Sequence, residues 1–108
     1  MKLSIRNRLI LLNLLPKETS YNYITYKVLN TLRMDLSFSD KEIKEYDIKI
    51  VDNRVHWNMV KEKPKEVEIG ETAQAIIATA LTELDKQGKI SEENADLYEW
   101  FVLKENKG

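Results

Sequence analysis

Apolar residues recur at helical spacing through the first part of the chain. Between Ile5 and Leu15 they cover almost the whole circumference of a helix, which is typical of a helix at the centre of a core. Ser4 is placed as its N-cap, and Pro16 ends it, because the residue before a proline is pushed out of helical space. The pattern predicts a helix over 5–15.

A second apolar stripe predicts a helix that ends near Leu36. Thr19 or Ser20 is expected to cap its start. Four-residue spacing places the stripe on one face of the helix. Its members are Ile24, Val28, Leu32 and Leu36, with Tyr21 and Leu29 widening it.

The segment Ser39-Asp40-Lys41-Glu42 forms a capping box and predicts a short helix from Asp40 to about Tyr46. After it, apolar and polar residues alternate, as in strands. The alternating apolar positions are Ile48, Ile50, Val55 and Trp57. Asp52-Asn53 lies between the two pairs, and both residues tolerate positive φ, so we predict a β-hairpin with its turn there. Further alternation at Val67 and Ile69 indicates a third strand.

Helical spacing returns from Glu71 to Gln87, and Gly88 follows where a helix C-terminus favours left-handed backbone. Ser91 is expected to cap a last helix. Its predicted inner face consists of Ala95, Tyr98, Phe101 and Val102. Leu97 and Trp100 are expected to lie off that face, and residues 104–108 to fray.

These elements predict an α+β fold with about five helices and a small antiparallel sheet, either a hairpin or three strands, around one core. The chain has 108 residues, which is the size of one ordinary domain, so we predict a single domain over 1–108.

Composition narrows the functional classes. The formal net charge is −1, whereas a free-standing nucleic-acid binder usually carries a clear positive excess. The chain contains no cysteine, which favours a reducing cytoplasm over secretion. The longest apolar run, Leu9 to Leu15, is far shorter than the ~20 residues that a bilayer span needs. We therefore expect a cytoplasmic protein without a membrane segment.

No catalytic pattern stands out. His56 is the sole histidine and is expected on the outer face of the hairpin, where a surface role is far more common than catalysis. An enzyme would need a cleft that converges on it with acidic neighbours. The chain has no glycine-rich phosphate loop, no nucleophile motif and no carboxylate spacing of the EF-hand type. We predict no catalytic residue, no cofactor and no metal site, and hence a protein that is not an enzyme.

Two aromatic pairs are the candidate partner-binding residues. Tyr23 and Tyr26 share a helix face outside the main apolar stripe, and tyrosine is enriched at interfaces. A rim of the core, where the hydroxyls stay in water, is the simpler explanation of the same pair. Leu97 and Trp100 form a second apolar strip on the last helix. A helix with two apolar sides near a chain end indicates a partner, commonly a second copy of the same chain, and so predicts a homodimer.

A DNA-binding alternative follows from the element order, because three helices followed by a hairpin are the layout of a winged helix. The residues argue against it. The would-be recognition helix, 40–46, has at least as many acids as lysines and lacks the arginine, asparagine and glutamine that contact base edges.

The opening segment 1–18 resembles the start of small bacteriophage and prophage proteins without assigned function, and the similarity extends to the segments 36–39, 66–71 and 88–93. This resemblance implies an accessory protein in the bacterial host cytoplasm. Such proteins often act by binding, including as inhibitors of host enzymes or defence systems. A non-enzymatic protein that binds a host or phage protein is thus the leading hypothesis.

Overall fold

The computed structural model describes residues 1–17 and 21–103, and within them helices combine with two separate antiparallel sheets. This is the predicted α+β class. In chain order the elements are β1 (Lys2–Leu3), α1 (Ile5–Leu14), α2 (Tyr23–Leu36), α3 (Asp40–Glu45), β2 (Lys49–Val51), β3 (Arg54–His56), β4 (Lys65–Glu66), α4 (Glu71–Lys86) and α5 (Ala95–Phe101).

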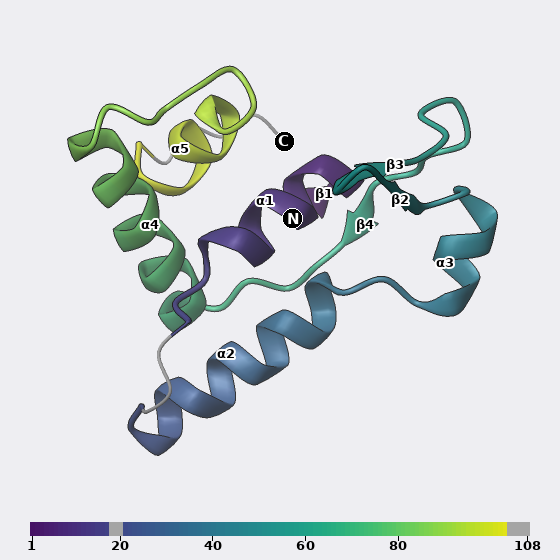
Figure 1. Ribbon diagram of the computed structural model, residues 1–108. Coiled ribbons are helices and arrows are strands. Elements are labelled where there is room, and N and C mark those ends of the chain that lie inside the picture. The colour runs from purple at the N-terminus through teal and green to yellow at the C-terminus, as the bar shows by residue number, and fades with distance from the viewer. Residues whose placement is uncertain (18–20, 104–108) are drawn as a thin grey trace.

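The core lies where α1, α2 and α4 pack against one another, with α5 against α4. Figure 1 shows α1 passing through the middle, α2 below it, and α4 with α5 on the side opposite α3 and the hairpin β2–β3. The buried cluster draws on all four of these helices and on two extended segments. Its members are Leu3, Leu11, Leu15, Leu29, Leu32, Leu36, Val67, Ala73, Ile77, Leu81, Leu97 and Phe101.

The third strand lies before the predicted alternation at Val67 and Ile69, at Lys65–Glu66, and has a different partner from the one expected. β4 pairs with β1, in the register Lys2↔Glu66 and Leu3↔Lys65, and does not extend the hairpin. The N-terminal amine reinforces this pairing, since it donates to the carboxylate of Glu66 at 2.8 Å and to the carbonyl of Val67 at 3.0 Å. Strand β1 is too short to show an alternating pattern, so the sequence did not predict it.

The hairpin itself is confirmed. β2 and β3 pair with Ile50 opposite Val55, and the two turn residues have positive φ, 52° at Asp52 and 63° at Asn53. Gly88 likewise has the predicted left-handed φ of 68° after α4. Turn chemistry within a few residues was sufficient to place both features.

Two helices begin at other residues than their predicted caps implied. Helix α2 begins after Asn22, whose side chain accepts from the backbone N–H of Thr25 at 2.8 Å. Thr19 and Ser20, the expected caps, lie outside the described residues, and Tyr21 precedes the helix. The last helix begins later than the Ser91 cap implied, at Ala95, because Asn94 and Ser91 close a turn first.

Arg8 is the buried charge that the sequence did not reveal. Only 1% of it is exposed. Its guanidinium donates to the carbonyls of Leu36 and Ser37 and to the carboxylate of Glu42, at 2.6 Å for the shortest carboxylate contact, and lies 4.1 Å from the centre of the Phe38 ring. This single side chain therefore ties α1 to the junction between α2 and α3.

Candidate protein-binding groove

The predicted strip on the last helix is not an exposed patch. Leu97 is completely buried, and Trp100 is half-buried and packs against the core cluster. The expectation that both lie off the inner face of the helix was wrong. Complete burial removes Leu97 from the candidate partner-binding residues, whereas the partner-binding role of the half-buried Trp100 stays a prediction. The predicted homodimer rested on this strip as an exposed apolar surface, and the strip is not exposed.

The packing of α5 on α4 explains the difference. Leu97 and Phe101 are the buried residues of α5, while the hydroxyl of Tyr98 donates to the carboxylate of Asp85 at 3.2 Å. A tyrosine at the border of a core can keep its hydroxyl in water, whereas a leucine has no polar group that favours such a border position. The inner face of α5 therefore combines Phe101 of the predicted face with Leu97 of the second strip, and the position of α4 decides this combination.

The two tyrosines of α2 are both exposed, but they lie in different settings. Tyr23 is 71% exposed and lines a groove between α2 and the start of α4. Tyr26 is 55% exposed and does not line it. Of the two tyrosines, Tyr23 therefore lines the groove and Tyr26 lies outside it.

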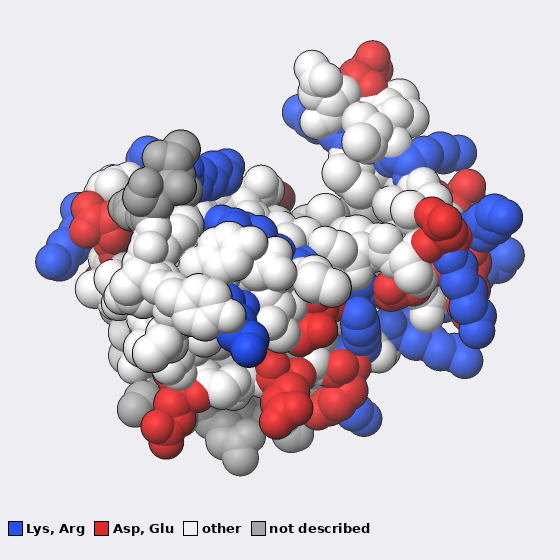
Figure 2. Space-filling view, turned by 90° about the horizontal axis from the view of Figure 1, so that it is seen from below, with Lys and Arg blue, Asp and Glu red and all other residues white. Residues whose placement is uncertain are grey.

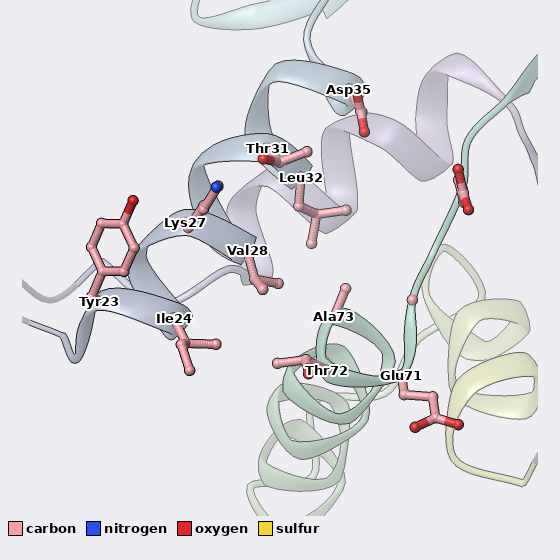
Figure 3. Close-up of a pocket in the computed structure, with 12 residues that line it drawn as sticks. Tyr23, Ile24, Lys27, Val28, Thr31, Leu32, Asp35, Glu71, Thr72 and Ala73 are labelled. Carbon is pink, nitrogen blue, oxygen red and sulfur yellow. The ribbon is translucent and has the colours of Figure 1, made fainter.

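The groove exists because the apolar stripe of α2 extends beyond the core. Leu32 and Leu36 at one end of the stripe are buried, Val28 is half-buried, and Ile24 at the other end is 70% exposed. An isoleucine at core spacing with most of its surface in water is a costly arrangement unless something covers it. Figure 3 shows the side chains of Ile24, Val28 and Leu32 in a row facing the first turn of α4.

The opposite wall is low because its residues are small. It consists of Gly70, Thr72 and Ala73, none of which reaches across to the exposed end of α2. A Cβ built on Gly70 would meet nothing within 4 Å, so the space beside it is open. The groove has a volume of about 590 Å³ and is open to solvent.

The charge around the groove is mainly negative. Asp35, Glu68 and Glu71 line it, against the one cation Lys27. Within the described ranges 1–17 and 21–103, none of these three carboxylates forms an ion pair. Figure 2 views the molecule from the α2 side and shows a wide, mostly uncharged area that contains a few basic side chains and has groups of acidic side chains beside it.

Other parts of the surface are weaker candidates for a binding or catalytic site. His56 is exposed on β3, opposite Lys49, and lines neither hollow described here. A smaller hollow of about 280 Å³ includes Arg6, Trp57 and Glu62, and there the indole N–H donates to the carboxylate at 2.7 Å. Among the residues that the structure describes, no group of three or more histidines and carboxylates is placed to hold a metal ion.

The winged-helix alternative gains no support from the surface of α3. Its exposed charged side chains are two acids and two lysines, and Glu42 is already engaged by Arg8. A recognition helix that docks on phosphates usually presents an excess of positive charge.

No protein-family model, curated protein or solved structure matches the chain. The resemblance to phage proteins therefore stays a prediction. In the described part of the chain, no helix has both the length and the apolar composition needed to cross a bilayer.

Proposed function

We propose that this protein acts by binding another protein rather than by catalysis, and that the α2–α4 groove receives an amphipathic helix of that partner. The observation that carries the proposal is the exposed end of the α2 stripe. Ile24 belongs by its spacing to the same face as the buried Leu32, yet it lies in water beside a hollow. A partner helix would complete the packing that α4 leaves unfinished.

The dimensions suit a helix. Ile24 and Leu32 are separated by about 12 Å along α2, from the ~1.5 Å rise per residue, which is about two turns of a partner helix. Recognition of this kind uses apolar anchors at positions i, i+3 or i+4, and i+7. A pocket for a small molecule would enclose most of its ligand, whereas this groove is open and its lining isoleucine is mostly exposed.

The setting we propose is the cytoplasm, in keeping with a chain that has no cysteine. A phage accessory protein that inhibits a host enzyme or defence system is one form that such a binder could take. The alternative of a DNA-binding regulator is less favoured, since the groove is bordered by carboxylates.

The test is site-specific cross-linking in cells that produce the protein. A photo-cross-linking amino acid replaces Tyr23 in the groove or, as a control, Met34, which is 68% exposed on the same helix but outside the groove. We expect a discrete cross-linked protein from position 23 and none from position 34.

A second substitution makes the test depend on the groove. Ile24→Asp should abolish the cross-link from position 23, and Met34→Asp should leave it unchanged. Both side chains are exposed, so we expect each change to alter the free energy of unfolding by no more than about 0.5 kcal/mol. A cross-link that survives Ile24→Asp would refute the groove as the binding site.

A further inference from the structure

We infer that the partner helix is basic, with its cationic residues meeting the Asp35–Glu68–Glu71 side of the α2–α4 groove. This inference rests on the proposed function and specifies the chemistry of the partner. It follows from the distribution of charge around the groove.

The charges are separated along α2. Lys27 lies near Tyr23 and Ile24, at the exposed end of the apolar stripe. Asp35 lies two turns further on, at the end where the chain segment leading into α4 passes. Of the described lining residues, Lys27 therefore lies toward the exposed end of the stripe and Asp35 toward the other end, while Glu71 lies on the first turn of α4 with its carboxylate directed away from α2.

The acidic residues are available to a partner. Glu68 and Glu71 are exposed, Asp35 is half-exposed, and the described residues offer none of the three a side-chain hydrogen bond or an ion pair. Lys65 approaches Asp35, but its ammonium donates to the backbone carbonyl at 2.9 Å and not to the carboxylate. A partner cation would thus gain attraction without displacing an existing pair.

The same charges disfavour other occupants. An acidic helix would bring like charges together across a surface of low polarity, which weakens binding and slows encounter. A nucleic acid would bring phosphates to the same carboxylates. Apolar contact with Ile24 and the half-buried Val28 supplies the affinity, and the acidic side selects among apolar helices by their charge.

The experiment uses two synthetic fluorescent helical peptides of 18 residues. Both carry the same leucine stripe, and the polar face is lysine-rich in one and glutamate-rich in the other. Binding to the full chain is measured by fluorescence anisotropy at increasing salt. We expect the lysine peptide to bind about tenfold more tightly at low salt, through several exposed ion pairs, and this difference in affinity to narrow as salt screens them.

Two charge reversals locate the effect. Glu68→Lys should remove most of the preference for the lysine peptide. Glu45→Lys changes the net charge equally, on α3 and away from the groove, and should leave the preference nearly intact. Equal effects of the two reversals would mean that overall charge selects the peptide, and would overturn the inference.

The remaining outcomes separate this inference from the proposed function. If both peptides bind equally and Ile24→Asp prevents both, the groove binds helices without charge selection and only the inference fails. If neither peptide binds, the groove does not accept an amphipathic helix, and both proposals fail.

Discussion

The Arg8–Glu42 pair allows a stability prediction that can be worked out from the structure. The shortest contact between guanidinium and carboxylate is 2.6 Å, and the side chains are 1% and 19% exposed. Hydrogen bonding from Arg8 lowers the pKa of Glu42 from its ordinary 4.5 to about 2. We predict that Glu42→Gln destabilises the protein and that this effect depends on pH.

The magnitude follows from linkage between protonation and folding. A carboxyl whose pKa falls from 4.5 to about 2 on folding corresponds to about 3 kcal/mol of stability at neutral pH, at ~1.4 kcal/mol per pH unit. Glu42 is partly exposed, so solvent screening reduces this, and we expect a loss of about 1–2 kcal/mol. Glutamine can still accept the bond from Ser39 that closes the capping box, so the substitution mainly removes the charge.

The pH dependence has a definite sign. A carboxyl with a lowered folded-state pKa stabilises the protein fully above pH 4.5, and this contribution disappears as the pH falls toward 2. Urea unfolding followed by circular dichroism should show the largest gap between wild type and Glu42→Gln near pH 7. The gap should narrow steadily below about pH 5.

Two further variants control the interpretation. Glu45→Gln removes an exposed carboxylate from the same helix and should change stability by no more than about 0.5 kcal/mol at any pH. Arg8→Met combined with Glu42→Gln should recover part of the loss, because an apolar residue replaces a buried charge that lacks its partner. A gap of constant size from pH 7 to pH 2.5 would refute the reasoning, since it would mean that the charge of Glu42 contributes nothing.

Further predictions concern residues whose settings the structure makes explicit. Leu97→Ala should lower the free energy of unfolding in urea by about 2–5 kcal/mol, because it leaves a cavity between α5 and α4. Ile24→Ala should lower it by less than about 0.5 kcal/mol. Equal losses would contradict the assignment of Leu97 to the core and Ile24 to the groove. Gly88→Ala should cost about 1 kcal/mol, since φ is 68° while a Cβ there would meet nothing within 4 Å. An unchanged midpoint for Gly88→Ala would argue against left-handed backbone at that position.

The sequence by itself determined the features that depend on a few neighbouring residues. The capping box of Ser39 and Glu42, the hairpin turn at Asp52-Asn53 and the left-handed Gly88 all formed where predicted. Helical spacing also placed α1, α2 and α4 to within a few residues. Capping bonds, turn dihedrals and helical spacing are local, so the chain encodes them without reference to its fold.

Only the tertiary structure decided which apolar faces are covered. The apolar stripe of α2 predicted a buried helix face. The stripe is longer than the part of α4 that could cover it, and the small residues at the start of α4 leave Ile24 exposed. On α5 two apolar strips were candidates for burial, and packing against α4 buried Leu97 of the second strip. Apolar spacing measures how much surface a helix offers for burial, and the partner that covers it comes from a distant part of the chain.

The same reason applies to the polar features that the sequence did not predict. In the sequence Arg8 is one of two arginines in an otherwise largely apolar helix. Its burial became possible only where two backbone carbonyls at the end of α2 and the carboxylate of Glu42 converge on it. The groove likewise combines α2 with the segment before α4, which are separated by more than 30 residues of sequence. Local signals thus specified the elements of this protein, and long-range packing created the surface on which its proposed function depends.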